Sequence, residues 1–409
     1  MLPAFNLPIS LRGLAWNEGA ALLLSTNDLL SLLTLLPLGL LAYSYLGYPA
    51  LLWLVTRVGR QRPPESPPKQ WPTVSVVLAA FNEAPVIRAR LENLLSLDYQ
   101  PDRLKVLVGS DGSSDQTCER VRELAAPAVE LYAFPNRRGK ASVVNDLIAA
   151  ADGDIVVMTD ANTFFRPDAV RELVAALGRW PQASAVVGEL ELLPGPSGKS
   201  VEGFYWRYET WLKRLESRFG CVLGANGAIY AFPRRRYQPL PSNAVVDDFL
   251  IPMLMQLRHG GKVFFVSGAR AHESAPDELS AEFRRRVRIG AGDWQALFLT
   301  WRLLSPLRGM LALAYFSHKV LRWLGPWFLL LALGANLLLF RHPLFRWLLL
   351  AQLGFYALGI LAGLLRPIPL LGRIAGAVRH FLTINAALWL GSLRFVFRLQ
   401  RPFWTTARE

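Results

Sequence analysis

Cysteine and acidic residues are scarce in this sequence, and so are charged residues of any kind. The two cysteines among 409 residues, Cys118 and Cys221, exclude a disulfide framework and a zinc site built on a CxxC pair, and they fit a reduced location that faces the cytosol. Charged residues form 19% of the chain, whereas a typical soluble domain carries roughly 25%. Hydrophobic residues form 52%, and the mean hydropathy is +0.25. This apolar content excludes a disordered chain and argues against an ordinary soluble protein.

The shortage of acid leaves the chain strongly basic, with 45 Lys and Arg against 31 Asp and Glu and a net charge of +14. Such an excess attracts nucleic acid, anionic lipid headgroups and phosphorylated small molecules alike. The sequence shows no basic groove interleaved with aromatic residues, the pattern typical of proteins that bind single-stranded nucleic acid. Much of the basic excess flanks long apolar segments instead, so we expect a lipid bilayer as a partner and no nucleic acid.

One long uncharged stretch lies near the N-terminus, at 29–56. About 20 apolar residues suffice to cross a bilayer. Arg57, Arg60 and Arg62 follow the stretch, and by the positive-inside rule they place the next segment in the cytoplasm. The stretch is too long, and its basic residues lie on the wrong side, for a cleavable signal peptide. We therefore expect a retained membrane span.

The C-terminal third has the same character. Segments 323–340 and 347–365 carry no charge and are about long enough to cross a bilayer. Segment 381–393 is uncharged but short, and Arg379 and Arg394 flank it, so it either spans with its arginines snorkelling or lies at the interface. The basic residues after it favour a cytoplasmic tail, which conflicts with three C-terminal spans and leaves their number and orientation open. We expect a multi-pass protein of the cell inner (plasma) membrane.

These features divide the chain into six parts. A globular part of ordinary composition lies between two membrane regions, and its length is usual for a domain. The predicted parts are an N-terminal membrane segment (1–61), a Pro-rich linker (62–72), a cytoplasmic globular domain (73–280), a basic amphipathic interfacial region (281–318), C-terminal transmembrane helices (319–400) and a tail (401–409).

The globular part predicts an α/β fold with a mostly parallel sheet. Short apolar runs alternate with segments that have helical spacing, as in open α/β sheets. The runs predicted to be buried strands are 74–80, 104–109, 129–134 and 155–159. Ligands of such sheets bind beyond the carboxyl ends of the strands. Polar clusters stand at those ends, at 81–83, 110–112 and 160–162.

Two of these clusters, together with the basic turn 137–140, suggest a site for a nucleotide and a cation. Asp160 and Asn162 alternate on an extended strand end, so both side chains face one way and suit a hard divalent cation, or else they cap a helix. The basic turn 137–140 opens a helix and suits phosphate, or else it is a solvated loop. Asp111 accepts hydrogen bonds from a base or ribose, or else forms a plain Asx turn.

Further candidates follow later in the chain. Asp247 and Asp248 precede an apolar run, where adjacent carboxylates raise one pKa and yield a general base, or else they only begin a helix. The pair 226–227 shapes an acceptor pocket or a simple turn. The arginine cluster 284–288 binds a diphosphate or lipid headgroups. His272 is a third metal ligand or, more commonly for a lone histidine, unliganded.

The order of these motifs resembles that of membrane-anchored family 2 glycosyltransferases. The relatives are the cellulose, hyaluronan and poly-N-acetylglucosamine synthases and related bacterial exopolysaccharide enzymes. The motifs that carry the resemblance are VSVVLAAFNE, SDGSSD, NRRGKASVVN, TDAN, NGAIYAF, DDF and RRVRIGAG. The resemblance implies a GT-A nucleotide-sugar fold at the cytoplasmic face of the membrane.

The resemblance also assigns donor residues. Ala80 and Glu83 match positions that flank the nucleotide. Asp111 matches the aspartate that contacts the base, with Ser110 in place of the usual preceding aspartate. Lys140 matches a basic residue near the donor diphosphate.

The metal and base positions are implied in the same way. Asp160 matches the first aspartate of the DxD metal motif for Mg²⁺ or Mn²⁺, and Asn162 replaces the second. Asp248 matches the general base of the TED motif. Asp247 stands where Glu is usual, and Val246 stands where Thr is usual.

The QxxRW motif of the family is only partly kept. Arg288 keeps the arginine that holds the diphosphate, and Arg285 stands at the Gln position. Ile289 replaces the Trp that stacks on the acceptor sugar, and Trp294 is the nearest substitute. Asn226 and Gly227 are the remaining acceptor-binding candidates.

Together these assignments predict an inverting transferase that moves a sugar from a nucleotide-sugar donor to a growing polysaccharide or a lipid-linked acceptor. We expect the donor to be a UDP-linked sugar. One alternative is a non-processive lipid glycosyltransferase. An alternative of another class is a catalytically silent membrane scaffold or nucleotide-sugar sensor. With three or four spans, a homo-oligomer or an export partner is the expected source of any sugar-conducting pore.

Overall fold

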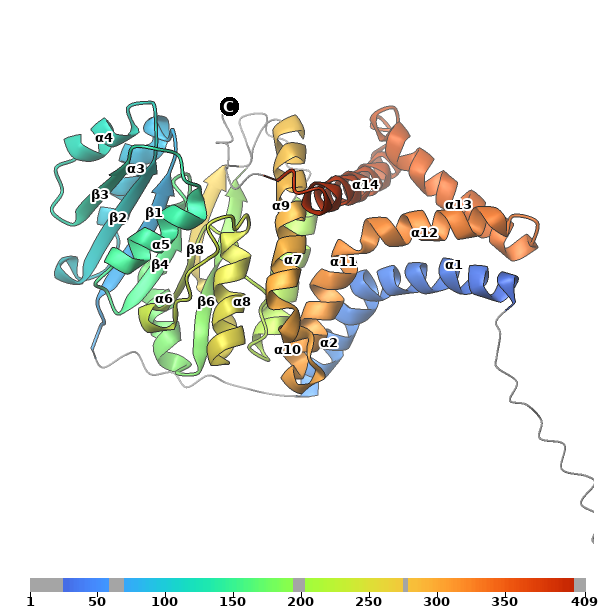
Figure 1. Cartoon of the computed structure of the whole chain (residues 1–409), viewed down its shortest axis with the longest axis horizontal. Coiled ribbons are helices and arrows are strands. Elements are labelled where there is room, and N and C mark those ends of the chain that lie inside the picture. Colours follow the sequence, from blue (N-terminus) through green and yellow to red (C-terminus); the bar gives the residue numbers. More distant parts are fainter. Residues whose placement is uncertain (1–24, 59–69, 194–202, 275–278, 401–409) are drawn as a thin grey trace, which may run out of the picture.

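The computed structural model describes residues 25–58, 70–193, 203–274 and 279–400 (Figure 1). Most of the predicted linker, 62–69, and the predicted tail, 401–409, lie outside the described residues. A sheet with helices on both faces forms one end of the molecule, and a group of long apolar helices forms the other (Figure 1).

The sheet has eight strands in the order β3-β2-β1-β4-β7-β6-β8-β5. The strands are β1 (Val74–Ala80), β2 (Leu104–Asp111), β3 (Val129–Phe134), β4 (Ile155–Thr159), β5 (Phe164–Phe165), β6 (Ala183–Leu193), β7 (Tyr230–Pro233) and β8 (Lys262–Ser274). The first four pair in parallel, as predicted, and β2 extends two residues beyond its predicted end. All seven residues of β1 are buried, which explains why six of them are apolar, and the buried Ser75 Oγ accepts the Gly153 amide (3.0 Å).

The second half of the sheet is mixed. Strand β7 lies antiparallel between β4 and β6, while β6 and β8 are parallel and β5 is antiparallel to β8. The prediction of a mostly parallel α/β sheet is confirmed, with antiparallel pairs joining its two halves. The carboxyl ends of β1, β2 and β4 therefore share one edge.

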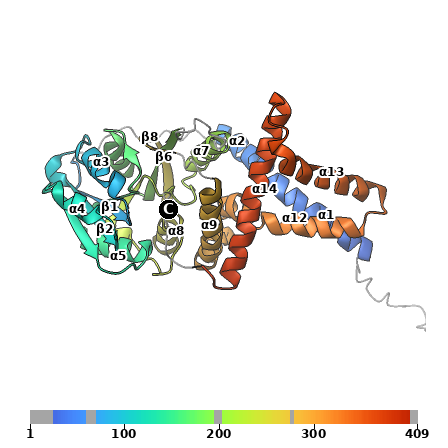
Figure 2. The same cartoon turned by 90° about the horizontal axis from the view of Figure 1, so that it is seen from above.

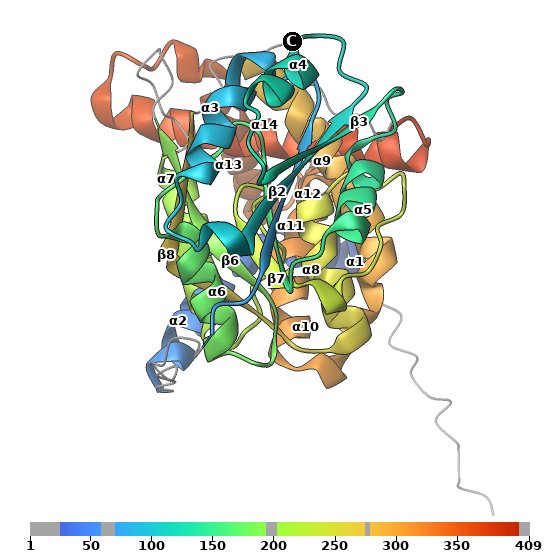
Figure 3. The ribbon, with the colours of Figure 1, turned by 90° about the vertical axis from the view of Figure 1, so that its left-hand side faces the viewer.

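Helices cover both faces of the sheet. Helices α3 (Ala84–Leu95) and α6 (Ala169–Arg179) pack on one face, and α5 (Lys140–Ala150) and α8 (Asp247–His259) pack on the other (Figure 3). Helix α4 (Thr117–Glu123) lies beside α3. In β1, Val76 and Leu78 face the α3–α6 core, and Val77 and Ala79 face the α5–α8 core. The α5–α8 core continues toward the apolar helices, because it also contains Tyr48, Leu303, Tyr315 and Trp323.

Two helices stand between the sheet and the apolar helices, α7 (Gly203–Ser217) and α9 (Leu279–Thr300) (Figures 1 and 2). Helix α9 also packs along α14 (Pro369–Val396). The predicted interfacial region 281–318 corresponds to α9, the short turns η4 (Trp301–Leu304) and η5 (Pro306–Arg308), α10 (Met310–Ala314) and the first residues of the π-helical turn η6 (Tyr315–Val320).

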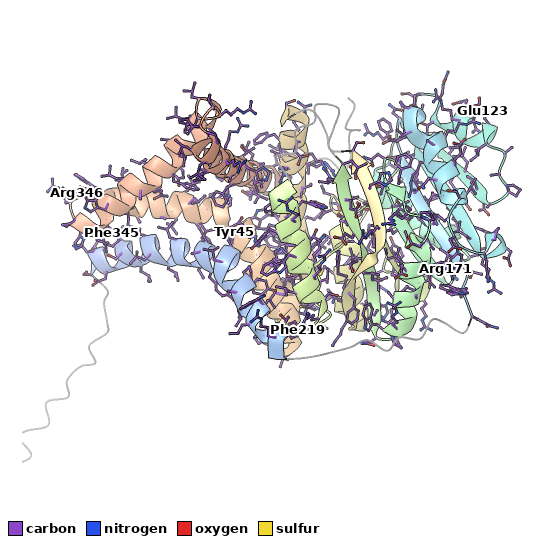
Figure 4. The ribbon with its side chains drawn as sticks, turned by 180° about the vertical axis from the view of Figure 1, so that it is seen from behind. Tyr45, Glu123, Arg171, Phe219, Phe345 and Arg346 are labelled. Carbon is purple, nitrogen blue, oxygen red and sulfur yellow. The ribbon has the colours of Figure 1, made fainter. Side chains whose placement is uncertain are left out.

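Two helices of the described chain are long and apolar enough to cross a membrane, Thr26–Arg57 and Pro343–Gly363. The first comprises α1 (Thr26–Ala42), the π-helical turn η1 (Tyr43–Gly47) and α2 (Tyr48–Val58), and the second contains α13 (Pro343–Ile360). A third candidate is a pair bent by 59°, Met310–Trp323 with Gly325–Leu338, which includes α11 (Leu321–Trp323) and α12 (Gly325–Leu338). Phe345 and Arg346 mark the end of this group farthest from the sheet (Figure 4).

Candidate active site

The loops that follow β1 and β2 are fastened to each other. The Asn82 side chain accepts a hydrogen bond from the Ser114 amide (2.9 Å), and the Asn82 amide donates to Ser113 Oγ (3.1 Å). Asn82 has φ 52, a left-handed conformation that asparagine tolerates better than most residues. The Glu83 amide donates to Thr117 Oγ1 (2.9 Å). These bonds fix the loop that holds the predicted nucleotide residue Glu83.

Asp111 holds the basic turn in place. It is fully buried, and its Oδ1 and Oδ2 accept the backbone amides of Arg138 (2.7 Å) and Gly139 (2.9 Å). Gly139 has φ 94, which suits glycine because it lacks a Cβ. The predicted nucleotide residues Ala80 and Asp111 thus lie at adjacent strand ends, and both oxygens of Asp111 bind the turn that leads into Lys140.

Lys140 brings together two carboxylates that are far apart in the sequence. Its Nζ lies 2.9 Å from Asp160 Oδ1, after β4, and 3.2 Å from Asp247 Oδ2, at the start of α8. Burial by itself raises the pKa of Asp160, but Lys140, with Arg285 and Arg90 behind it, outweighs burial and lowers that pKa. Asp160 is therefore held as a carboxylate.

Asp160 and Asp248 point at the same place. A Cβ added to Gly227 would lie 3.0 Å from Asp160 Oδ2 and 3.5 Å from Asp248 Oδ2. Both distances start at one point, so the two oxygens are no farther apart than the sum of these distances. Gly227 has φ 74, in the left-handed region, which brings the backbone close to both carboxylates. The structure thus brings predicted metal, base and acceptor residues to one position.

Asp248 combines a fixed orientation with a raised pKa. The Phe249 amide donates to its Oδ1 (2.9 Å), which leaves Oδ2 directed toward Gly227. Burial and the adjacent Asp247 carboxylate raise the pKa of Asp248 to about 6, and Lys140 opposes this shift. A carboxylate with a pKa near neutral accepts protons better than an ordinary aspartate does.

The oxygen atoms near Asp160 fit a divalent cation. Asp160 Oδ2 accepts no hydrogen bond from the described residues. The Asn162 amide nitrogen donates to Glu273 Oε1 (2.9 Å), which leaves its side-chain carbonyl oxygen available to a cation. Within the described ranges, no three His, Cys, Asp or Glu residues are placed to bind a metal on their own. One or two protein oxygens, completed by substrate phosphates and water, is the usual arrangement for Mg²⁺.

The basic residues of α9 approach the same site. Arg288 Nη1 donates to the Val245 carbonyl (3.2 Å), just before the two aspartates of α8. Arg285 lies in the field of Asp160, and its pKa is raised because Glu282, Glu273 and Asp160 together outweigh its burial. Trp294 is half-buried farther along α9.

Two other predicted residues have structural partners. Asn226 donates to the Gly188 carbonyl (3.3 Å), and its side-chain oxygen accepts the Ile229 amide (3.3 Å), so it shapes the turn at Gly227. The His272 ring stacks on Phe164, with ring centroids 5.8 Å apart.

Sequence reasoning missed Arg90, which supports Asp160 from behind. It is fully buried in α3, and its Nη2 donates to Thr159 Oγ1 (2.7 Å) while its Nη1 donates to Asn93 Oδ1 (2.5 Å). Thr159 in turn donates to the Ala228 carbonyl (2.8 Å), which ties the end of β4 to the Gly227 turn. The signal in the sequence is an arginine that follows Ile87 and precedes Leu94 on the apolar stripe of α3.

Comparisons with known proteins agree with this geometry. The family model described as "Glycosyl transferase family 2" matches residues 75–220, and the one described as "Glycosyl transferase family group 2" matches residues 155–371, more than half of the chain.

Relatives are found among bacterial enzymes. An N-acetylglucosaminyltransferase of Bradyrhizobium diazoefficiens is 27% identical over 301 residues, which cover 64% of this chain and 56% of the relative. A probable glycosyltransferase of Bacillus subtilis, YdaM, is 37% identical over 242 residues (55% and 56%). The poly-beta-1,6-N-acetyl-D-glucosamine synthase of Staphylococcus aureus is 25% identical over 230 residues (55% and 55%). The matches span little more than half the length of these relatives.

A solved structure has the same fold. The mannosyltransferase PcManGT of Pyrobaculum calidifontis, solved in complex with GDP-Man and Mn²⁺, superposes with a TM-score of 0.68. The match covers 90% of this chain and 99% of that one, at 24% sequence identity. The fold is therefore of the GT-A type, with apolar helices at both ends of the chain.

Proposed function

The chain belongs to glycosyl transferase family group 2, and on that premise we propose that it transfers a sugar from a nucleotide-sugar to an acceptor hydroxyl with inversion. The observation that carries this proposal is the convergence of Asp160 and Asp248 on Gly227. We assign Asp160 to the cation that neutralises the leaving group. We assign Asp248 to the acceptor hydroxyl, as its base.

The donor half of the site consists of the loops after β1 and β2 and of Lys140. The buried carboxylate of Asp111 holds the turn that aims Lys140 at Asp160. Asp160 and Asn162 would supply oxygen ligands for Mg²⁺ or Mn²⁺, and the ion would neutralise charge on the departing nucleoside diphosphate. Lys140 and Arg288 add fixed positive charge there. The donor that we propose is a UDP-linked sugar, in line with relatives named for N-acetylglucosaminyl transfer.

The acceptor half contains Asp248. Its Oδ2 removes the proton of the acceptor hydroxyl. The hydroxyl oxygen of the acceptor bonds to the anomeric carbon at the same time, and the bond between this carbon and the diphosphate oxygen breaks. Attack on the face opposite the leaving group inverts the configuration. Lys140 lies 3.2 Å from Asp247, so it compensates the second negative charge beside the base.

The location that we propose is the inner membrane, with several spans and the sheet in the cytoplasm. Arg57 ends the first candidate span on the side that leads to the sheet, and basic residues favour the cytoplasmic side. Helices α7 and α9 then hold the site next to the group of long apolar helices (Figure 1). We propose that a lipid-linked or polymeric acceptor reaches the site from this side.

Among these acceptors, one observation favours single addition to a lipid over processive polymerisation. Ile289 stands where the synthases that the chain resembles place a stacking tryptophan, and it packs against the apolar core beside α8. An aliphatic side chain in the core offers no face for an acceptor sugar to stack on.

Incubation of the purified full chain, in lipid nanodiscs, with labelled nucleotide-sugars and Mn²⁺ tests the proposal. Product appears as label in an organic lipid extract for single addition, or as insoluble polymer for processive synthesis. The Asp248→Asn variant yields neither, and Asp152→Asn, an exposed change far from the site, yields the same product as the parent. Donor binding without transfer to any lipid or saccharide acceptor would overturn the proposal in favour of a sensor or scaffold.

A further inference from the structure

The loop that carries the two proposed cation ligands, 160–163, is fastened at both ends. Before the loop, Thr159 Oγ1 accepts a hydrogen bond from the buried Arg90 Nη2 (2.7 Å). After the loop, β5 pairs antiparallel with β8, and the Phe165 amide of β5 also donates to Asn93 Oδ1 (2.9 Å). The loop is therefore held beside the end of β8.

Glu273 reaches this loop from β8. It directly follows His272, which pairs with Phe164 of β5. Glu273 is half-buried, and its Oε1 accepts the side-chain amide of Asn162 at 2.9 Å. The two residues are 111 positions apart in the sequence, so the pairing of β5 with β8 is what brings them together.

This hydrogen bond fixes which way the Asn162 amide points. An ionised carboxylate only accepts hydrogen bonds, whereas a carboxamide donates through its nitrogen and accepts through its oxygen. The Asn162 nitrogen therefore faces Glu273, and its Oδ1 faces away from Glu273. Without such a partner the carboxamide would be free to turn over and present its N–H groups, which repel a cation.

The charge state of Glu273 depends on its surroundings. Burial and the charge of Asp160 raise the pKa of Glu273 to about 7, while Arg285 and the hydrogen bond from Asn162 oppose this shift. Above that pH the group is mostly a carboxylate, which accepts the amide of Asn162 and donates nothing to it.

Glu273 also accounts for the asparagine in the loop. The synthases that the chain resembles have an aspartate at the position of Asn162. An aspartate there would turn a second carboxylate toward Glu273 at hydrogen-bond distance, where like charges repel. Asparagine replaces this repulsion with a hydrogen bond and still offers one oxygen to a cation. The change from DxD to DxN is thus matched by a carboxylate on β8.

We infer that Glu273 is a positioning residue, which holds the Asn162 side chain so that its Oδ1 faces the cation beside Asp160. The inference rests on the proposed function and adds to it a residue that acts through Asn162. Groups that hydrogen-bond to a metal ligand from behind fix its orientation, and their removal typically weakens metal binding about 10- to 100-fold.

Titration of Mn²⁺ into the full chain in lipid nanodiscs, followed by electron paramagnetic resonance at pH 8, tests the inference. Glu273→Ala should weaken Mn²⁺ binding at least about tenfold. Glu273→Gln keeps an oxygen that accepts the Asn162 amide, so its affinity should stay within about threefold of the parent value. Equal losses in the two variants would show that Glu273 supplies charge and not orientation, and would overturn the inference.

The matched control is Glu191→Ala. Glu191 is an exposed glutamate on the neighbouring strand β6, where it pairs with Arg270 (3.4 Å). This variant should bind Mn²⁺ as the parent protein does. If Glu273→Ala lost stability but kept its Mn²⁺ affinity, the bond to Asn162 would be purely structural, and the inference would be wrong.

A double-mutant cycle tests whether Glu273 acts through Asn162. A residue that works only through a second side chain has no further effect once that side chain is removed. In a protein that already carries Asn162→Ala, Glu273→Ala should therefore weaken Mn²⁺ binding less than about twofold. A full additive loss would show that Glu273 contacts the cation directly, and this result would refute the positioning role.

Glu273→Leu serves if Glu273→Ala does not fold. Leucine fills much of the same space and has no hydrogen-bond acceptor, so the same results are expected, and the same results would contradict the inference.

Asp160→Asn separates this inference from the proposed function. If Asp160→Asn weakened Mn²⁺ binding while no Glu273 variant did, the inference alone would be refuted. If Glu273 and Asn162 were coupled as expected but the protein transferred no sugar, the proposed function alone would be refuted. Mn²⁺ binding that does not depend on Asp160 would refute the cation site on which both rest.

Discussion

Asp160 and Asp248 turn their Oδ2 atoms toward the same turn, 3.0 and 3.5 Å from the position that a Cβ on residue 227 would occupy. The two carboxylates come from different parts of the chain, one at the end of a parallel strand and the other in the first turn of α8. Lys140 binds the other oxygen of Asp160 and keeps that group ionised. The charged pair Lys140 and Asp160, which we assign to the donor, and Asp248, which we assign to the acceptor as its base, thus meet at the Gly227 turn.

Replacement of the base tests the role of Asp248. Asp248→Asn keeps the shape of the side chain but removes its proton affinity, so kcat should fall by about 10²–10⁴-fold. Donor affinity should change less than threefold, because the donor half of the site lies at Asp160 and Lys140. Turnover and equilibrium binding of the nucleotide-sugar measure the two effects, and normal turnover in this variant would remove Asp248 from the mechanism.

The pH profile follows from the raised pKa of Asp248, which is about 6. The base must be ionised to accept a proton, so kcat at saturating donor should be constant above that pH and fall about tenfold per unit below it. Lys140 stabilises the carboxylate, so Lys140→Met should move the inflection to higher pH. An inflection near pH 4, that of an ordinary aspartate, would contradict the buried environment.

Gly227→Ala probes the shared position directly. Its methyl group would stand 3.0 Å from Asp160 Oδ2 and would also occupy a left-handed backbone position. We expect loss of at least about tenfold in Mn²⁺ affinity, measured by electron paramagnetic resonance, together with loss of turnover. Gly260→Ala is the matched control, because Gly260 has φ 64 but no atom within 4 Å of the added carbon.

Both glycines have a positive φ, so each alanine variant carries backbone strain. They should therefore both lose stability, while only the Gly227 variant loses metal binding. Equal Mn²⁺ affinity in the two variants would show that the position at Gly227 is not part of the cation site.

Asp111→Asn tests whether this carboxylate supports the basic turn. The amide keeps one acceptor for two backbone N–H groups, so one of them loses its partner. The free energy of unfolding should fall by about 1–3 kcal/mol, measured by denaturant titration. Asp98→Asn, which removes an exposed pair with Arg171, should change it by less than about 1 kcal/mol. Weaker donor binding at unchanged stability would instead support direct contact between Asp111 and the nucleobase of the donor.

Much of the fold could be predicted because its signals are local. The apolar runs at 74–80 and 155–159 become β1 and β4 because both faces of these strands are covered, so nearly every position in them is apolar. The insertion of β7 between β4 and β6 depends on long-range antiparallel pairing and leaves no such local pattern. The short segment 381–393 belongs to a much longer helix, α14, whose charged turns lie beyond the uncharged stretch.

The candidate site was predictable where a motif marks it. Asp160 and Asp248 follow or precede apolar runs in a recognisable order, and the structure brings them together. Arg90 was missed because a lone arginine on the apolar stripe of α3 carries no motif, and only the folded structure brings it to Thr159.

The most direct measurement is a structure of the full chain with Mn²⁺ and an unreactive nucleotide-sugar. We expect the ion near Asp160 Oδ2, close to the roughly 2.1 Å typical of Mg²⁺–oxygen bonds. The anomeric carbon should lie between that ion and Asp248, whose Oδ2 should face it from the side opposite the diphosphate. An ion bound away from Asp160, or an Asp248 side chain directed away from the sugar, would contradict the account.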